Sequence, residues 1–303
     1  MNNLKFINSP LNYIGSKYKL LNQIICLFPK NIDIFYDLFS GGCSVGINVK
    51  ANKIIINDIN KHLIDFYKFL TTVDTDYLLR KIDDFILFYN LSDTKKYSYN
   101  YYNVNSSIGL KKINQKGYLK LRSDYNSNKY DNDEKQIAFY LLIVYGFNNQ
   151  IRFNKKGSFN TPCGKRDFNT KMLNKLIEFK KCLNEKQIKF CSNSYEEFLN
   201  LDFNTNDFIY IDPPYLISTS TYNENNLWNK EQEIKLYNFL DSLNNKNIKF
   251  ALSNVLEHKN LTNTILKDWS SKYKIHYLDF NYNNSNYQKN KKSKTIEILV
   301  TNY

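Results

Sequence analysis

The sequence predicts an α/β fold: an open, mainly parallel sheet with helices on both faces, interrupted by an inserted, mainly helical domain. Short apolar runs rich in β-branched and aromatic residues alternate with longer segments of helical periodicity, which is typical of strands buried on both faces. Residues 92–135 differ, because they are polar and rich in Asn, Tyr, Lys and Ser. We therefore expect one sheet domain in two parts, residues 1–75 and 187–303, with an inserted domain at residues 76–186.

The composition is that of a globular protein with a polyanionic partner. The 303 residues carry a net charge of +13. Asn, Lys, Ile and Tyr are the residues of AT-rich codons, so genomic composition is a second source of the lysine excess. Five cysteines without a C-x-x-C pair predict a reduced, cytoplasmic protein without a zinc site. The chain begins without a signal peptide, and its longest apolar stretch, residues 137–147, is far shorter than the ~20 residues that cross a bilayer, so we expect no membrane association.

The first elements predict a nucleoside-binding βαβ unit. Residues 16–28 have the apolar spacing of a helix, residues 34–39 predict a buried strand, residues 40–46 a glycine loop that opens a helix, and residues 53–57 a second strand followed by Asp58. Glycines let the backbone approach a ligand closely, and an acid after the second strand can accept ribose hydroxyls. Glycine also serves tight turns for purely structural reasons. The absence of a G-x-x-x-x-G-K-[ST] motif argues against a P-loop nucleotide triphosphatase.

The inserted domain combines helices with a basic hairpin. A helix is expected at residues 60–73, just before the insertion, and within the insertion we expect a helix at residues 77–89 and a buried core segment at residues 137–147. Two short alternating runs around Asn-Lys-Lys-Gly then predict a β-hairpin over residues 148–160. Its cations, amides and aromatic rings suit a reader of duplex DNA, because they can contact phosphates and base edges and fill the space that a base has left. An exposed basic hairpin without a partner has the same pattern.

Strands and helices resume after the insertion. The expected strands are residues 188–191, 208–211, 248–253, 275–280 and 295–301, and the expected helices are residues 230–243 and 261–269. A polar loop with Tyr222 and Trp228 follows the second of these strands. The loop before the last strand contains Lys289, Lys291, Lys292 and Lys294. Such a charge run is usually a solvated loop, but beside a nucleic-acid cleft it would reach phosphates.

The motif Asp212-Pro213-Pro214-Tyr215 carries the strongest signal for chemistry. It ends a buried strand, so Asp212 is expected at the carboxyl edge of the sheet, where open α/β sheets bind ligands. The two prolines stiffen the turn and withhold two backbone donors, which leaves carbonyls free to face a cleft. Because Pro and Asp are also common turn formers, a purely structural turn is the alternative.

This cluster suits methylation of an exocyclic amine, which requires in-line placement of a sulfonium donor and the amine lone pair. Asp212 and the Pro213 carbonyl would accept the two amine hydrogens and direct the lone pair toward the donor, while Tyr215 stacks on the base. In duplex DNA the base must first be flipped out. No residue pattern calls for a catalytic metal.

Six segments occur in an order that makes them more specific than any one alone. They are residues 10–17, residues 37–46, residues 57–60, residues 151–160 with Pro162, residues 212–215 and residues 252–254. Over nearly the whole chain, this order resembles that of Dam-type DNA adenine N6-methyltransferases of the alpha class.

The resemblance implies a Rossmann-like sheet that uses S-adenosylmethionine, and it makes the insertion a target recognition domain. It implies that the donor is bound by Tyr13, Lys17, Asp37, Phe39, Ser40, Gly41, Gly42, Cys43, Ser44, Asp58 and Asp212. It implies that double-stranded DNA is bound by Arg122, Asn149, Arg152, Phe153, Asn154, Lys155, Lys156, Asn160 and Arg166. The implied function is adenine methylation in restriction-modification or DNA marking, with GATC as a guess at the site and a cognate restriction endonuclease as a separately acting partner.

Two positions depart from the family pattern. Cys43 stands where a third glycine or small residue is usual, and we expect it to be tolerated. After the strand at residues 188–191, the acid that often contacts the donor adenine is missing. The segment Asn193-Ser194-Tyr195-Glu196 leaves open which side chain replaces it.

Other activities fit the motifs less well. A cytosine C5-methyltransferase needs a nucleophilic Cys, usually after Pro, but Pro162-Cys163 lies in the hairpin region, so we interpret Cys163 as structural. N4-cytosine methyltransferases commonly have Ser, and protein-glutamine methyltransferases usually have Asn, in place of Asp212. A DNA-binding homologue that has lost catalysis is the alternative from a different class, and the intact motif and glycine loop argue against it.

Overall fold

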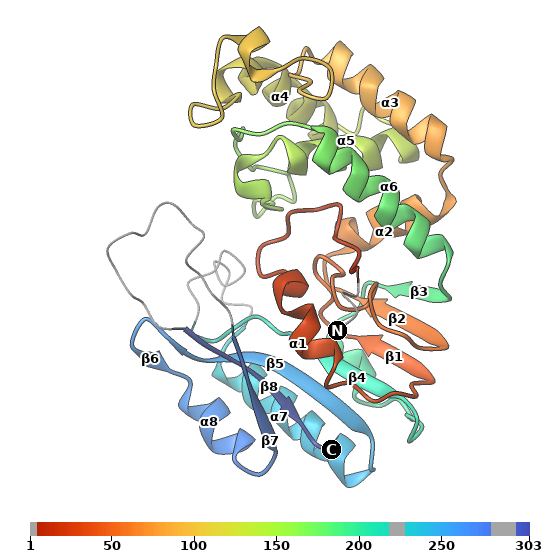
Figure 1. Ribbon diagram of the computed structural model, residues 1–303, viewed down its shortest axis with the longest axis vertical. Helices are drawn as coiled ribbons and strands as arrows, with labels where there is room; N and C mark the ends of the chain where they lie inside the picture. Colours follow the sequence, from red (N-terminus) through yellow and green to blue (C-terminus); the bar gives the residue numbers. More distant parts are fainter. Residues whose placement is uncertain (1–4, 218–227, 280–294) are drawn as a thin grey trace.

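The computed structural model describes residues 5–217, 228–279 and 295–303, and it shows an eight-stranded sheet with helices packed around it (Figure 1). The strand order is β3-β2-β1-β4-β5-β8-β7, and β6 pairs with β5 beside this path. The five strands from β3 to β5 are parallel, whereas β8 runs antiparallel to both of its neighbours. The strands are β1 (Ile34–Asp37), β2 (Lys53–Asn57), β3 (Ile188–Cys191), β4 (Phe208–Ile211), β5 (Lys249–His258), β6 (Leu261–Thr262), β7 (Lys274–Leu278) and β8 (Thr295–Thr301). The predicted α/β class with a mainly parallel sheet is confirmed.

The direction in which the chain extends the sheet reverses between β1 and β4. After β1 the chain adds β2 and β3 on one side, whereas β4 and β5 lie on the other side. Open α/β sheets bind ligands outside the carboxyl ends of the strands at such a switch point. Asp37 ends β1, and Asp212 directly follows β4. The topology therefore brings both acids to the place where a ligand site is expected.

Each face of the sheet has its own hydrophobic core. Along β4, Phe208 and Tyr210 belong to one core, and Ile209 and Ile211 belong to the other. Because successive side chains of a strand point to opposite faces, the strand is buried on both sides. The first core continues into α1 to α6, and the second continues into α7 and α8. The helices are α1 (Leu21–Ile25), α2 (Lys61–Thr72), α3 (Thr75–Phe88), α4 (Lys111–Asn126), α5 (Asn132–Val144), α6 (Thr170–Asn184), α7 (Lys230–Asn245) and α8 (Thr264–Ser270).

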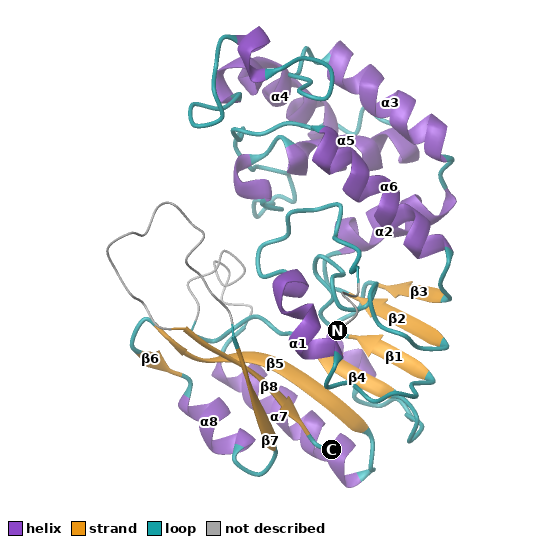
Figure 2. Cartoon of the chain, viewed as in Figure 1, coloured by secondary structure: helices purple, strands orange, loops and turns teal. Residues whose placement is uncertain are grey.

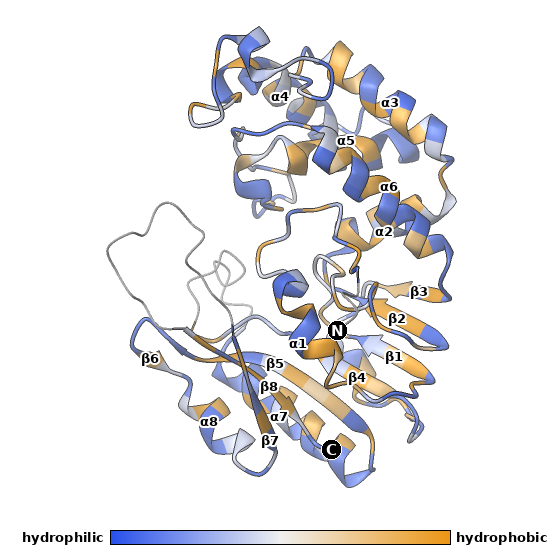
Figure 3. Cartoon of the chain, in the orientation of Figure 1, coloured by the Kyte–Doolittle hydropathy of each residue, from blue (hydrophilic) through white to orange (hydrophobic). Residues whose placement is uncertain are grey.

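The helices α3 to α6 gather beyond the β3 edge of the sheet (Figure 2). Their centre is α5, whose residues 137–144 are all buried, so the apolar stretch expected as a core segment is a helix. In Figure 3, α3 alternates between hydrophobic and hydrophilic residues, the pattern of an amphipathic helix. Asp74 and Asp131 cap α3 and α5 by accepting backbone N–H groups. The division at residues 76 and 186 stays a prediction.

The structure corrects three local predictions. No helix follows the glycine loop, because Gly41 and Cys43 have φ values of 46° and 58°, outside the helical range, and residues 41–48 form consecutive turns instead. The first helix is a short 3₁₀ turn, Lys17–Leu20, followed by α1. The predicted hairpin has no extended strands: its arms pair through the antiparallel bridge between Phe153 and Phe159 and through backbone bonds from Asn154 to Ser158 and from Asn160 to Arg152.

Some elements were not predicted, and some predictions lie outside the described residues. The helices α4 and α6 were missed, and so was the two-residue strand β6. The strand expected at residues 248–253 extends to His258. Tyr222 and the four lysines of residues 289–294 are not described. In the part of the chain that the structure describes, no helix is long and apolar enough to cross a membrane.

Candidate active site

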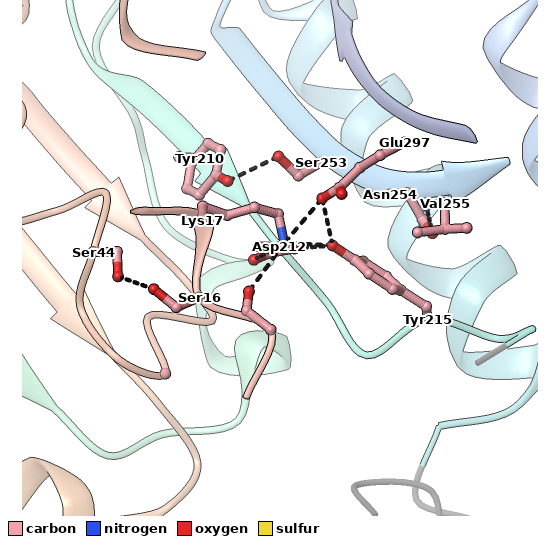
Figure 4. Close-up of polar contacts among 12 residues, drawn as sticks. Ser16, Lys17, Ser44, Tyr210, Asp212, Tyr215, Ser253, Asn254, Val255 and Glu297 are labelled. Carbon is pink, nitrogen blue, oxygen red and sulfur yellow. Dashed lines mark hydrogen bonds and ion pairs between the residues drawn. The ribbon is translucent and has the colours of Figure 1, made fainter. Parts of the chain in front are cut away.

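Lys17, Asp212, Tyr215 and Glu297 form one polar cluster beside the carboxyl end of β4 (Figure 4). The Nζ atom of Lys17 lies 2.7 Å from Asp212 Oδ2 and 3.4 Å from Glu297 Oε1. The Tyr215 hydroxyl lies 2.9 Å from Asp212 Oδ1 and 3.3 Å from Glu297 Oε1, and it also accepts a hydrogen bond from Lys17. The side chains of Lys17 and Glu297 are 5% and 6% exposed, and that of Asp212 is 17% exposed. The cluster therefore joins three separate parts of the chain around the predicted catalytic acid.

Burial and charge act in opposite directions within this cluster. Burial raises the pKa of Asp212, and the charge of Lys17 opposes this rise. For Lys17, burial favours the neutral form, but Asp212 and Glu297 outweigh it, so the pKa of the lysine is above its ordinary value. Burial and the two carboxyl groups also raise the pKa of Tyr215 well above its ordinary value. At neutral pH, Lys17 is therefore a cation and Tyr215 a neutral hydroxyl.

Asp37 and Ser40 each have one buried polar atom that no other described residue pairs. Asp37 Oδ2 accepts the N–H of Gly46 at 3.1 Å. Its Oδ1 atom and the Ser40 hydroxyl are buried and have no hydrogen-bond partner among the described residues. Burial raises the pKa of Asp37 well above its ordinary value, although the Gly46 N–H opposes the rise. Because most buried polar groups are paired, these two atoms mark a position where a ligand would complete the structure.

Tyr13 packs directly on the glycine turn. A Cβ atom at Gly41 would lie 2.6 Å from Tyr13 Cε1, and one at Gly42 would lie 2.7 Å from Tyr13 Cβ. At Gly46 a Cβ atom would overlap Ile56 Cδ1 and approach Asp37 Oδ2 to 3.0 Å. Glycine is thus required here for close packing against the chain's own side chains.

Asp58, Cys43 and Ser44 shape the same turn. Asp58 Oδ2 accepts the N–H of Gly41 at 2.9 Å, and Oδ1 accepts the N–H of Asn60 at 2.8 Å. Cys43 is fully buried with a left-handed backbone, which is the conformation that the usual glycine would adopt more easily. The Ser44 hydroxyl lies 2.7 Å from that of Ser16. Asp58 thus holds the turn directly, Cys43 is buried in it, and Ser44 joins it to Ser16.

The aromatic rings of Phe39, Tyr195 and Trp228 pack together beside the glycine turn. The Phe39 ring lies 5.4 Å from the Tyr195 ring and 5.7 Å from the Trp228 ring, measured between centroids. The backbone of Asn193 is fixed by Asn57, whose side-chain oxygen accepts the Asn193 N–H and whose side-chain nitrogen donates to the Asn193 carbonyl, both at 3.0 Å. No hydrogen bond within the described part of the chain uses the Asn193 side chain. Tyr195 points instead toward Gln232.

The predicted DNA-reading pair Arg152 and Asn160 meets across the hairpin. Arg152 Nε donates to Asn160 Oδ1 at 2.8 Å, and Nη2 donates to the Asn160 carbonyl at 3.1 Å. Both residues are only partly buried. Phe153 is also partly buried, and its ring stacks on His62 of α2 at 4.3 Å. The Arg152 guanidinium is thus held by Asn160, whereas the Phe153 ring packs against His62.

The amides Asn149 and Asn154 have structural contacts. Asn149 Nδ2 donates to the carbonyls of Ile143 and Val144 at the end of α5, at 3.0 and 3.2 Å. Asn154 Oδ1 accepts the N–H groups of Lys156 and Ser158 and closes the hairpin turn. The amide nitrogen of Asn149 and the amide oxygen of Asn154 are therefore already engaged within the protein.

The four remaining residues that were predicted to contact DNA differ in exposure and in their hydrogen bonds within the protein. Arg122 donates to the Thr161 carbonyl at 3.0 Å and ties α4 to the hairpin. Arg166 is exposed and donates to the Ser106 carbonyl at 3.3 Å. Lys155 and Lys156 are exposed at the hairpin tip.

Sequence reasoning missed Glu297 and Phe147, two residues whose positions in the structure point to a functional role. Glu297 reaches the Asp212 cluster from β8, where it is the one charged residue of a mainly apolar strand, and that charge inside a buried strand was the available signal. Phe147 is 45% exposed just before the left-handed residues Asn148 and Asn149. An exposed aromatic ring next to an amide pair was the signal there.

A ligand-binding α/β protein is the class that this fold and site define: an open, mostly parallel sheet with an acid at or just after the end of each switch-point strand and a glycine turn beside them. The family model for D12 class N6 adenine-specific DNA methyltransferases matches residues 13–284. The chain belongs to this family, which confirms the resemblance inferred from its motifs.

Named relatives agree with the family. Modification methylase StsI of Streptococcus sanguinis is 44% identical to this chain, over 99% of the chain and 43% of the relative. Type II methyltransferase M.FokI of Planomicrobium okeanokoites is 42% identical, over 98% of the chain and 43% of the relative. The DNA adenine methylase of Escherichia coli strain K12 is 23% identical, over 88% of the chain and 85% of the relative. The chain therefore spans less than half the length of the first two relatives and most of the third.

Proposed function

We propose that the chain is a site-specific DNA methyltransferase that transfers a methyl group from S-adenosylmethionine to N6 of a flipped-out adenine in duplex DNA. The observation that carries this proposal is the position of Asp212 and Tyr215 at the switch point of the sheet, beside the glycine turn. Membership of an adenine-specific DNA methyltransferase family supports adenine as the methylated base and DNA as the substrate.

The residues at the glycine turn fit the donor. Asp37 Oδ1 and the Ser40 hydroxyl lack partners among the described residues, and leaving a buried polar group unpaired costs about 1–3 kcal/mol. The ammonium and ribose hydroxyls of S-adenosylmethionine are groups that a carboxylate oxygen and a hydroxyl can bind. When bound, this donor supplies a methyl group on a positively charged sulfur.

The contacts divide the predicted donor site into two groups. Residues that line the glycine turn or belong to the Asp212 cluster would touch the donor, whereas side chains that hold the turn together would keep it in shape. We place Tyr13, Lys17, Asp37, Phe39, Ser40, Gly41, Gly42 and Asp212 in the first group, and Cys43, Ser44 and Asp58 in the second. We add Asn193 as the side chain that faces the donor adenine in place of the missing acid, because its backbone is fixed at the end of β3.

Asp212 is the proposed acceptor for the target amine. An amine whose two hydrogens are held by the Asp212 carboxylate and the Pro213 carbonyl directs its lone pair away from both, toward the donor methyl. Pro213 and Pro214 keep the carbonyl and the carboxylate in fixed relation. The methylated nitrogen must then lose a proton, and Asp212, whose pKa is raised by burial, is placed to accept it.

The distribution of charge supports residues 76–186 as the target recognition domain. Residues 94–123 contain seven Lys and Arg residues and no Asp or Glu, and residues 135–166 contain six and none. Codon bias accounts for many lysines but not for the absence of acids over such lengths. Exposed Lys111, Lys112 and Lys116 of α4 and the two lysines at the hairpin tip belong to these stretches. Such segregated positive charge suits the phosphates of duplex DNA.

We propose Phe147 as the ring that fills the space left by the flipped adenine. The sequence analysis gave this role to the aromatic rings of the hairpin, but the Phe153 ring stacks on His62 and Phe159 is buried. Phe147 is 45% exposed, and its backbone N–H is held by the Pro162 carbonyl at 2.8 Å. An exposed ring on a fixed backbone is what intercalation requires.

The relatives favour restriction-modification as the setting. A modification methylase and a type II methyltransferase are similar to this chain at more than 40% identity. We propose a cognate endonuclease that acts separately on the same DNA sequence, in the cytoplasm. GATC is the first target sequence to test.

Transfer of labelled methyl groups tests this function. We expect label from S-adenosylmethionine to enter duplex DNA that contains the target sequence. Donor binding without transfer to any duplex would contradict the proposal and favour a DNA-binding homologue that has lost catalysis.

A further inference from the structure

The Asp212 carboxylate is already occupied in the structure. Lys17 holds Oδ2 at 2.7 Å, and the Tyr215 hydroxyl lies 2.9 Å from Oδ1. If Asp212 accepts a hydrogen of the target amine, as the proposed function requires, at least one of these donors must give way. A buried ammonium or hydroxyl that loses its partner carries a free-energy cost, so the displaced donor needs a second acceptor nearby.

Glu297 provides that second acceptor for both donors. Its Oε1 atom lies 3.4 Å from Lys17 Nζ and 3.3 Å from the Tyr215 hydroxyl. Each of these distances is longer than the corresponding distance to Asp212, so a small movement of either donor exchanges one carboxylate for the other. The Tyr215 hydroxyl has a single proton, and this proton can point to only one carboxylate at a time.

The backbone of Glu297 has a strand partner on each side. The residue lies in the interior of the sheet, where it is paired with Val255 of β5 and with Leu278 of β7. Its side chain is only 6% exposed, so water does not readily replace it as a partner for Lys17. A carboxylate held in this way can receive a donor without moving itself.

We propose that Glu297 is a positioning residue that takes Tyr215 and Lys17 from Asp212 when the target amine binds. Asp212 is then free to accept the amine hydrogen, while neither donor is left buried without a partner. The inference rests on the proposed function, because it assumes that Asp212 binds the amine. It assigns to Glu297 an effect on the rate of transfer rather than on the affinity for DNA or donor.

The first test compares Glu297→Gln with wild type in single-turnover methyl transfer at saturating DNA and donor. Gln keeps the shape of the side chain but accepts a charged donor less well. We expect the transfer rate to fall about 10- to 100-fold, with the dissociation constants for DNA and donor within about twofold of wild type. Glu257→Gln is the matched control, because Glu257 lies on the adjacent strand β5 outside the cluster, and its rate should not change.

A double-mutant cycle with Tyr215→Phe tests the exchange itself. Without the hydroxyl, one oxygen of Asp212 is no longer occupied, so Glu297→Gln should lower the rate by a smaller factor than in wild type. An equal factor in both backgrounds would overturn the proposal. So would an unchanged rate for Glu297→Gln, or a Glu297→Gln protein that fails to fold, which would make the residue structural. Absence of transfer by the wild type would instead refute the proposed function. If Tyr215→Phe is too slow to measure, the rate and affinities of Glu297→Gln decide the question.

Discussion

The Lys17 ammonium lies 2.7 Å from Oδ2 of Asp212, and this ion pair joins the amino-terminal 3₁₀ turn to the loop that follows β4. Lys17 comes before the first strand, and Asp212 follows the strand at the switch point, so the pair exists only in the folded sheet. It places a permanent positive charge beside the acid that is proposed to bind the target amine.

Replacing Asp212 should separate transfer from binding. In Asp212→Asn the side chain keeps its size but loses the charge that accepts the amine hydrogen. We expect the single-turnover rate of methyl transfer to fall at least about 100-fold, while the dissociation constant for duplex DNA changes by less than about threefold. Electrophoretic mobility shifts and a filter assay measure the two quantities. An equal loss of both would refute the proposed division between the sheet and the helical insertion.

The rate of transfer should fall at acid pH because Asp212 must be ionised. Burial raises the pKa of Asp212, so the acid limb of the rate profile should have its midpoint above that of an ordinary aspartate. Glu297 also raises this pKa, whereas Lys17 lowers it. Glu297→Gln removes a negative neighbour and should therefore move the midpoint to lower pH. A midpoint that moves to higher pH would contradict the assignment of the limb to Asp212.

The glycine turn should not tolerate a methyl group at residue 46. A Cβ atom there overlaps Ile56 Cδ1, and Ile56 is fully buried, so Gly46→Ala should lower the free energy of unfolding by about 1–3 kcal/mol. Ile56→Val removes that Cδ1 atom. In the double variant the loss should be smaller than the sum of the two single losses, as measured by chemical denaturation. Simple additivity would show that the predicted contact does not limit the turn.

Charge at the hairpin tip should act on DNA of any sequence. Lys155 and Lys156 are exposed, so replacing both with Ala should weaken duplex binding to target and non-target sequences alike. The slope of log affinity against log salt should fall by about 2, because each phosphate contact contributes about 0.9. Lys249→Ala, at the amino-terminal end of β5, is a control that should change nothing. A loss restricted to the target sequence would show that these lysines read bases.

Arg152 should act differently from the lysines. Its guanidinium is held by Asn160 in a fixed position, which suits bidentate contact with a base edge. Arg152→Ala should reduce the preference for the target sequence by about 1–3 kcal/mol, measured as the ratio of affinities for matched and mismatched duplexes. The affinity for the donor should stay unchanged. A fall in donor affinity would indicate that the hairpin contributes to the donor site and not to DNA recognition.

Sequence reasoning found the elements whose residues decide their structure locally. Buried strands such as β2 and β4 are short runs of β-branched and aromatic residues, and the acids that end or follow them are placed by the direction of the strand. The position of Asp212 at the carboxyl edge of the sheet could therefore be predicted, whereas the strand order that makes this edge a switch point could not. The polar helix α4 escaped detection because most of its side chains are exposed and only one stripe is buried.

Other features depend on contacts between distant parts of the chain. Glu297 reaches the Asp212 cluster only because β8 lies between β5 and β7 in the sheet. No local sequence pattern predicts that strand order. Whether Asn149 and Asn154 were free to read bases could not be known before their backbone partners were visible. The turn after β1 departs from a helix because Cys43 takes a left-handed conformation, which its residue type does not favour.

The most direct test of the central claim is nucleoside analysis of duplex DNA after incubation with the protein and S-adenosylmethionine. Enzymatic digestion followed by mass spectrometry identifies the methylated base and its position. We predict N6-methyladenine with the wild type and, over the same incubation, at least about 100-fold slower formation with Asp212→Asn. N4-methylcytosine in the digest, or N6-methyladenine formed equally well by the Asp212→Asn variant, would contradict the account.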